Sequence, residues 1–275
     1  WIAEMGALDF AGGTVVHVSA GVSALVAAMV LGQRKEIDEE PQPHNVPFVI
    51  LGASLLWFGW FGFNGGSALG ANGLASLAII TTTLAAAAAM VTWVALEWKR
   101  DGHASAVGAM IGAVVGLVTI TPAAGFVTPM GAIAMGILGS IGAYFAIVLL
   151  SRFRIDDSLD VFACHGVGGI IGSILTGVFA TKSVNAGGAD GLLYGGGWEL
   201  VGIQTVGVVA AALFAGVLTV LLFVILKKTV GVRAADTHEE GGLDINAHGE
   251  AAYSTAVNAV AEPGDHTDDG QRKSA

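Results

Sequence analysis

Charged residues are scarce in this sequence of 275 residues, where Asp, Glu, Lys and Arg make up only 12%. Soluble globular proteins usually contain about a quarter of such residues. The hydrophobic share of 54% and the mean hydropathy of +0.72 point the same way. These values exclude an ordinary soluble domain. The 41 glycines fall largely within the apolar runs, which favours close helix packing in lipid over disorder.

Cysteine is also scarce, since Cys164 is the only one, and an internal disulfide is therefore excluded. A lone Cys in an apolar helix is usually a small packing residue, so we expect neither a metal site nor a cofactor. No signal peptide is recognised. Because the chain starts at Trp1 rather than Met, we expect a fragment that lacks an N-terminal part.

The net charge of −10 arises from acids outside the apolar runs. They cluster between Glu36 and Glu40 and again between Asp236 and Asp269. The excess of acidic residues therefore belongs to a loop and a tail, and it indicates neither binding to a basic partner nor binding to a nucleic acid.

Seven stretches are long and apolar enough to cross a bilayer as helices, for which about 20 residues are needed. Most are apolar all round, as expected of helices in a membrane bundle. The sequence therefore predicts an all-α integral membrane protein. The predicted spans are Asp9–Leu31, Val46–Ser67, Leu74–Glu97, Ala104–Thr121, Met130–Leu150, Val161–Ala180 and Leu200–Leu226.

Basic residues follow the first, third, fifth and seventh spans, whereas the opposite-side connections contain only Lys182. Because Lys and Arg mark cytoplasmic loops, we expect a multi-pass protein of the cell membrane with an external start and a cytoplasmic tail. We place the membrane domain at 1–233 and the tail at 234–275. The basic residues are Arg34, Lys35, Lys99, Arg100, Arg152, Arg154, Lys227, Lys228 and Arg233.

Two histidines, His17 and His165, lie inside apolar stretches, and each follows an aspartate, Asp9 or Asp160. Ionisable residues at membrane depth are costly and are functional candidates by default. The matching contexts suggest an internal repeat that brings both histidines into one site near mid-bilayer. Two neutral imidazoles can share one hydrogen bond and still bind a small polar molecule that exchanges protons. Metal or haem ligation is the alternative.

The two aspartates are expected to cap the helices that contain the histidines. Asp156 and Asp157, just before the sixth span, are interpreted as further caps or surface charges. The aromatic segment Trp57–Ser67 ends the second span. It fits either an interfacial anchoring belt or a vestibule that collects cations on aromatic faces.

Four segments resemble motifs of the ammonium transporter family, in the Amt branch of the Amt/Mep/Rh superfamily, and they occur in the family's order. They are Asp9–His17 (DFAGGTVVH), Gly59–Ser67 (GWFGFNGGS), Asp160–Gly169 (DVFACHGVGG) and Gly242–Tyr253 (GLDINAHGEAAY). The resemblance implies a fold of eleven transmembrane helices with an inverted repeat, assembled as homotrimers. On that map this chain corresponds to helices five to eleven.

The resemblance also implies roles for single residues in transport rather than in an enzyme reaction. His17 and His165 match the paired pore histidines, and Phe63 matches a phenylalanine of the external gate. Ser67 matches the hydroxyl of the outer ammonium site, and Asp9 matches the aspartate that supports it.

The expected mechanism follows from these roles, with Trp60 matching a pore-lining tryptophan. Ammonium is recruited outside, loses a proton and crosses as ammonia, because a bare ion is costly in an apolar pore. Whether the proton follows, as in an electrogenic transporter, stays open. In the tail the family motif implies contacts within the trimer and with a PII-type regulatory protein, through Gly242, Asp244, His248, Gly249, Glu250 and Tyr253.

Two other functions are considered. A membrane redox protein could use His17 and His165 as axial haem ligands, although the other histidines fall in loops or tail. An Rh-like gas channel or a sensor with the channel fold stays within the superfamily. The motif that starts at Asp9 favours the Amt branch, and the tail contains no kinase or cyclase segment.

Overall fold

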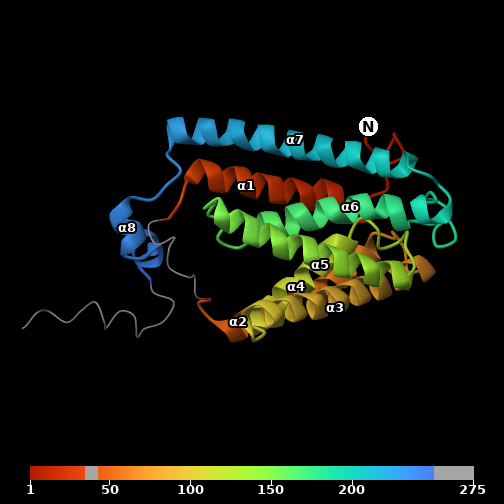
Figure 1. Cartoon of the computed structure of the whole chain (residues 1–275). Helices are drawn as coiled ribbons and strands as arrows, with labels where there is room; N and C mark the ends of the chain where they lie inside the picture. Colours follow the sequence, from red (N-terminus) through yellow and green to blue (C-terminus); the bar gives the residue numbers. More distant parts are fainter. Residues whose placement is uncertain (35–42, 251–275) are drawn as a thin grey trace, which may run out of the picture. The chain divides into compact units, whose positions relative to one another are not determined.

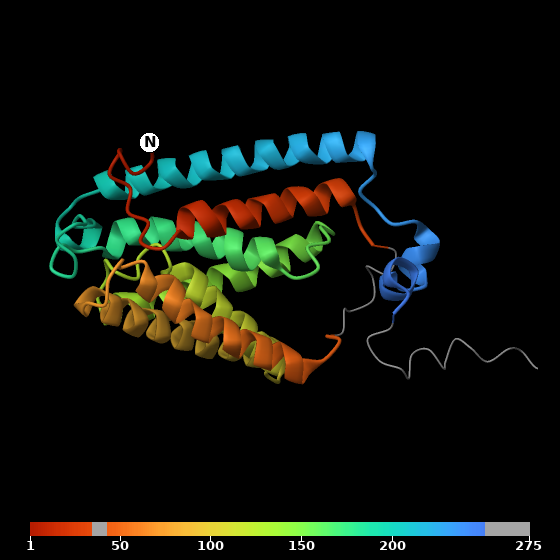
Figure 2. The ribbon, with the colours of Figure 1, turned by 180° about the vertical axis from the view of Figure 1, so that it is seen from behind.

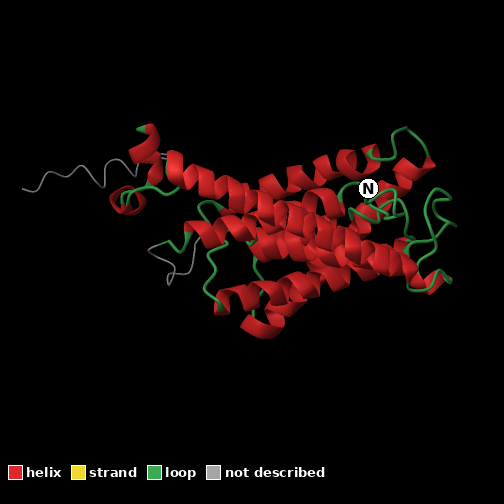
Figure 3. Ribbon diagram, turned by 90° about the horizontal axis from the view of Figure 1, so that it is seen from above, coloured by secondary structure: helices red, strands yellow, loops and turns green. Residues whose placement is uncertain are grey.

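The computed structural model describes residues 1–34 and 43–250, and every regular element in these ranges is a helix (Figure 3). The chain divides into two compact units, Trp1–Gly231 and Val232–Ala275, which are described separately. The basic residue Lys35, most of the acidic loop and the predicted tail residue Tyr253 lie outside the described residues.

The first unit is a bundle of long helices, three of which join a short π-helix (Figure 1). In a π-helix the backbone hydrogen bonds reach one residue further than in an α-helix. The elements are η1 (Gly13–Val18) with α1 (Ser19–Leu31), α2 (Val46–Trp60) with η2 (Phe61–Gly65), α3 (Gly73–Asp101), α4 (Ala106–Ile120), α5 (Pro129–Arg152), η3 (Phe162–Val167) with α6 (Gly168–Phe179), the 3₁₀ turn η4 (Leu192–Tyr194), and α7 (Glu199–Thr229).

Four helices start where the sequence offers a capping side chain. In each case the side-chain oxygen accepts the backbone N–H three residues further on, which satisfies a donor that has no partner within the helix. The capping residues are Asn45 for α2, Asn72 for α3, Ser105 for α4 and Thr128 for α5.

Six of the seven predicted spans correspond to helices that are long and apolar enough to cross a membrane. The remaining span, Ala104–Thr121, was predicted too long, because α4 has only 15 residues. Its start is fixed by the Ser105 cap, and a turn that contains Pro122 follows its end. Packed against α2, α3, α5 and α6, α4 has most of its residues buried by protein rather than by lipid.

Small residues allow the helices to approach closely, as expected of a bundle in lipid. A Cβ atom added to Gly116 of α4 would lie 2.5 Å from the carbonyl oxygen of Ala85 in α3. On α5, a Cβ atom at Gly136 would collide with the same oxygen. The helices α3, α4 and α5 therefore meet at backbone distance around Ala85.

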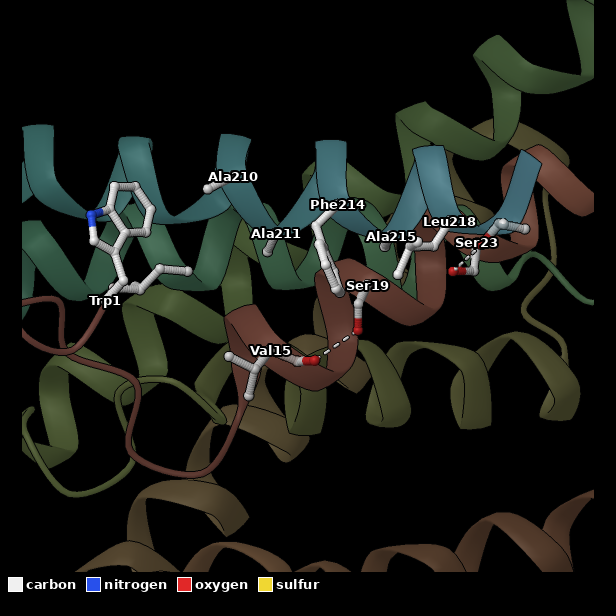
Figure 4. A pocket seen from close by; sticks show the side chains of 11 residues that line it. Trp1, Val15, Ser19, Ser23, Ala210, Ala211, Phe214, Ala215 and Leu218 are labelled. Carbon is white, nitrogen blue, oxygen red and sulfur yellow. Dashed lines mark hydrogen bonds between the residues drawn. The ribbon is translucent and has the colours of Figure 1, made fainter. Parts of the chain in front are cut away.

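The helices α1 and α7 lie side by side (Figures 1 and 2). An apolar groove of about 580 Å³ runs between them (Figure 4). The hydroxyl of Ser19 donates to the carbonyl oxygen of Val15, and Thr219 donates to the hydroxyl of Ser23. The groove therefore presents mainly apolar surface, and neither His17 nor His165 lines it.

The described residues of the second unit form two short elements, α8 (Asp236–Glu240) and η5 (Asp244–His248). Arg233 forms an ion pair with Glu239, with 2.9 Å between Nη2 and Oε2. The amide of Asn246 donates to the carbonyl oxygen of Gly242 at 2.8 Å. The described part of the tail thus has local structure of its own.

Candidate functional site

Each of the first three π-helices contains one predicted pore residue: His17 in η1, Phe63 in η2 and His165 in η3. In η1 the N–H of His17 bonds to the carbonyl oxygen of Gly12, five residues before it, at 3.2 Å. Such turns are frequent at functional sites, since they redirect a side chain within an otherwise regular helix. All three candidates therefore lie in locally widened turns.

The structure brings the two histidines together, although they are 148 positions apart in the chain. Nδ1 of His17 lies 3.2 Å from Nδ1 of His165, and the ring centroids are 5.2 Å apart. One ring must donate and the other accept, so the two neutral rings adopt different tautomers. Nε2 of His17 is buried and has no hydrogen-bond partner among the described residues.

Glycines allow this contact by bringing the two backbones together. A Cβ atom at Gly21 of α1 would collide with the backbone nitrogen of Gly166 in η3. A Cβ atom at Gly169 of α6 would lie 2.9 Å from the carbonyl oxygen of Gly13 and 3.1 Å from Cβ of His17. The small residues four positions after each histidine therefore have a structural function, which is to allow the crossing that pairs the imidazoles.

Two aromatic side chains flank the histidine pair. Trp60 stacks on His17 with 5.2 Å between centroids and 17° between planes, and Phe63 lies 5.9 Å from the same ring. Trp60 is held by a hydrogen bond from Nε1 to the hydroxyl of Thr121 at 3.0 Å. The sequence patterns did not single out Thr121, which lies in the turn just after α4.

Ser67 lies one helical turn after Phe63. Its hydroxyl donates to the carbonyl oxygen of Phe63 at 2.8 Å, so the oxygen lone pairs stay available as acceptors. The Phe63 side chain is itself 39% exposed. The end of η2 thus carries a partly exposed aromatic side chain and, one turn later, a hydroxyl oxygen that can accept a hydrogen bond.

Asp9 caps the helix that contains His17, as predicted. One carboxylate oxygen, Oδ2, accepts the backbone N–H groups of Thr14 and Val15 at 3.1 and 3.2 Å. The other oxygen, Oδ1, is buried and has no hydrogen-bond partner among the described residues. The carboxyl group is therefore fixed at the start of η1, and one of its oxygens remains without a partner among the described residues.

The prediction that Asp160 caps the helix containing His165 is wrong. The N–H of Phe162 at the start of η3 bonds at 2.6 Å to Oδ2 of Asp157, not to Asp160. Asp160 instead occupies a left-handed backbone conformation, with φ 53°, in the turn before the helix. The signal that could have identified Asp157 is its spacing: it lies eight residues before His165, as Asp9 lies eight before His17.

The Asp160 carboxyl lies in a partly buried place beside another acid. Burial and, second, the negative charge of Asp157 raise the pKa of Asp160 to about 6.

The turn before η3 also contacts the end of α1. Arg34 pairs with Asp156 at 2.7 Å, and Gln33 donates to the carbonyl oxygen of Arg154 at 2.7 Å.

The geometry does not fit the haem alternative. Metal-bound imidazole nitrogens lie about 2 Å from the metal, so two axial ligands would be about 4 Å apart with a haem plane between them. The observed 3.2 Å between the Nδ1 atoms of His17 and His165 is instead a hydrogen-bond distance.

Cys164 packs in an apolar cluster with Trp93 and Tyr144, as expected of a packing residue.

The predicted tail residues lie in the second unit. Asp244 and His248 belong to η5, and Gly242 and Gly249 have positive φ values of 88° and 70° on either side of it. Glu250 is the last described residue and is exposed. The motif therefore folds into a local turn in which the two glycines supply left-handed backbone conformations.

A comparison with protein-family models matches residues 1–253 to the model described as the Ammonium Transporter Family. An ammonium transporter of Aquifex aeolicus is 51% identical over 92% of this chain and 59% of its own length. An ammonium transporter of Bacillus subtilis is 47% identical over 94% of this chain and 63% of its own length. The chain thus spans about three fifths of these curated relatives.

Solved structures with the same fold are also found. The crystal structure of Saccharomyces cerevisiae Mep2 superposes with a TM-score of 0.79 at 40% identity, covering 86% of this chain and 55% of that one. A solved protein named "Sensor Amt Protein" gives a TM-score of 0.81 at 36% identity, covering 90% and 62%.

Proposed function

Since this chain belongs to the ammonium transporter family, we propose that it recruits ammonium at an external vestibule and conducts ammonia past His17 and His165. The observation that carries this proposal is the direct contact of the two imidazoles, 3.2 Å apart, within helices that are apolar enough to span a membrane. The pair is flanked on one side by the rings of Trp60 and Phe63.

Recruitment relies on groups that favour a small cation able to donate hydrogen bonds. The Ser67 oxygen can accept from ammonium, because its own proton is donated to the Phe63 carbonyl. The unpaired oxygen of Asp9 adds negative charge near the start of η1. The faces of Trp60 and Phe63 attract cations through their quadrupoles.

Conduction then requires that ammonium transfers a proton to water in the vestibule before it enters the apolar passage. An ammonium ion in an apolar passage has a desolvation cost that neutral ammonia avoids. The free Nε2 atom of His17 can form a hydrogen bond with ammonia, as donor or acceptor according to the tautomer. Potassium has no proton to lose, and selectivity against it follows.

The placement in the membrane and the assembly belong to the same proposal. The alternation of basic residues supports an external start and a cytoplasmic tail. We assign residues 1–233 to the membrane domain and 234–275 to the tail, and we expect homotrimers with one pore per subunit. A tail whose described residues are mostly exposed suits contact with a PII-type protein.

The test uses the full-length protein in liposomes, with ammonium and potassium gradients and the variants His17→Ala and His165→Ala. The expected result is ammonium-dependent uptake or current, absent with potassium and strongly reduced in both variants. Unchanged uptake in both variants would exclude the histidine pair from the pathway. Uptake without current would assign net conduction to neutral ammonia.

A sensor function is the second candidate, since one solved relative is named "Sensor Amt Protein". In a sensor, ammonium would bind without crossing. Saturable ammonium binding to the full-length protein, combined with no flux in the liposome assay, would favour this candidate over transport.

A further inference from the structure

Gln204 is a buried polar side chain in a helix that is otherwise apolar on its inner face. It is 2% exposed, and the other buried residues of α7 are Leu200, Gly207, Val208 and Ala215. A primary amide has two donors and an acceptor that must be satisfied inside a membrane protein. Its placement in a spanning helix therefore calls for a specific partner.

That partner is the backbone of Leu8. Oε1 of Gln204 accepts the N–H of Leu8 at 2.8 Å, and Nε2 donates to the carbonyl oxygen of Leu8 at 2.7 Å. The same Nε2 donates to the carbonyl oxygen of Ser173 in α6 at 2.9 Å. One side chain thus fixes both backbone groups of the residue directly before Asp9.

The backbone after Asp9 is fixed from another side. The N–H of Phe10 bonds to the carbonyl oxygen of Pro122 at 2.9 Å, and the N–H of Ala11 bonds to that of Thr121 at 3.2 Å. Asp9 therefore lies between two anchored positions. The direction of its side chain follows from these anchors rather than from the capping bonds alone.

The hydrogen bonds close into a ring. Oδ2 of Asp9 accepts the N–H of Thr14, whose hydroxyl lies 2.7 Å from the hydroxyl of Ser173. Ser173 in turn accepts from Gln204, which holds Leu8, the neighbour of Asp9. The ring joins η1, α6 and α7, and the carboxylate oxygen Oδ1 of Asp9 stays outside it, buried and without a partner among the described residues.

We propose that Gln204 is a positioning residue for Asp9, which it holds through Leu8 so that the unpaired carboxylate oxygen keeps a fixed direction. The proposal rests on the proposed function, in which Asp9 supports recruitment. It makes α7 a determinant of ammonium affinity, acting through the backbone rather than through contact with the substrate.

The test compares Gln204→Met with Thr205→Val in the full-length protein. Met has a similar length and no amide, so it removes all three hydrogen bonds. Thr205 is the next residue, and its hydroxyl donates to the Val201 carbonyl within α7. For Gln204→Met we expect a half-saturating ammonium concentration that is higher by on the order of tenfold, as for a misplaced binding group. The maximal rate should change less, and Thr205→Val should match the unchanged protein.

A second arm tests the ring itself with Thr14→Val, which removes the hydroxyl contact with Ser173. Because both changes open the same ring, Thr14→Val and Gln204→Met should be non-additive in the half-saturating concentration. Additive effects, or a Gln204→Met protein with the original half-saturating concentration, would overturn the positioning role.

If Gln204→Met does not assemble, Gln204→Glu takes its place. It keeps the acceptor for the Leu8 N–H but places a carboxylate oxygen against the two carbonyl oxygens that Nε2 contacted, so a shift at least as large is expected, and no shift overturns the proposal. Absence of ammonium transport by the unchanged full-length protein would instead reject the proposed function. Normal transport that is insensitive to Gln204 rejects only the positioning role.

Discussion

Asp9 and Asp157 stand in the same relation to the two histidines. Each lies eight residues before a histidine, and Oδ2 of each accepts a backbone N–H five residues further on, from Thr14 at 3.1 Å and from Phe162 at 2.6 Å. Both accepted N–H groups lie at the start of a π-helix. The two histidines are thus presented by locally equivalent structures, as an internal repeat requires.

Replacing Asp157 with Ala should loosen the turn that contains His165. The N–H of Phe162 loses its acceptor, and loss of a cap costs about 1 kcal/mol of stability. We expect a lower melting temperature and reduced ammonium uptake by the full-length protein. Asp101→Asn, which alters a carboxylate paired with Arg100 at the end of α3, serves as the control and should change neither quantity. Equal melting temperatures for both variants would contradict the cap.

Replacing Gly21 with Ala should separate the two histidines. The added methyl group would collide with the nitrogen of Gly166, which is backbone and cannot turn away as a side chain could. Overpacking of this kind costs about 1–3 kcal/mol, and uptake should fall with it. Gly52→Ala is the matched control, since nothing lies within 4 Å of its added atom. A Gly21→Ala protein as stable and active as Gly52→Ala would show that α1 and η3 can move apart to accommodate the methyl group without disturbing the histidines.

Replacing Thr121 with Val should remove the hydrogen bond that fixes the orientation of the Trp60 ring. The indole N–H is buried and would lose its acceptor, at a cost of about 1–3 kcal/mol. Because Trp60 stacks on His17, we also expect slower uptake. Thermal unfolding and uptake are measured beside Thr83→Val, since the Thr83 hydroxyl bonds to the Ile79 carbonyl of its own helix. Identical behaviour of the two variants would remove Thr121 from the site.

Replacing Asp160 with Asn should change how stability depends on pH. The pKa of Asp160 is raised from 3.8 to about 6 by burial and by Asp157, so the folded protein holds this proton more tightly than the unfolded chain does. The group therefore disfavours the folded state increasingly from about pH 4 to 6, and by a constant amount above that interval. Melting temperatures measured from pH 4 to 7 should decline less for Asp160→Asn, and parallel curves would contradict the assignment.

The membrane-spanning architecture follows from hydropathy because a span must be apolar along its whole length. The length of α4 does not, since an apolar run records neither the Ser105 cap nor the turn at Pro122 that bound the helix. The π-helices around His17 and His165 were also not predicted. A turn with one extra residue leaves little trace in a stretch that is apolar on every side.

The candidate site was predictable where the residue types are unusual in lipid, as for the two histidines. The cap of the second histidine helix is harder to assign, because Asp160 starts the apolar run and Asp157 fits either a further cap or a surface charge. The spacing to His165 identifies Asp157, which accepts the Phe162 N–H. Gln204 is a further residue that the sequence marks as unusual, because it is a lone amide within a long apolar helix.

The ring through Gln204 also has a consequence for the order of events during synthesis. Leu8 and Gln204 are 196 positions apart, so their hydrogen bonds cannot form until the first turns of α7 have been synthesised and have left the ribosome. At translation speeds of roughly 5–20 residues per second, that delay is about 10–40 s. During this time the Leu8 backbone lacks its Gln204 partner and can bond instead with water, lipid headgroups or the insertion machinery.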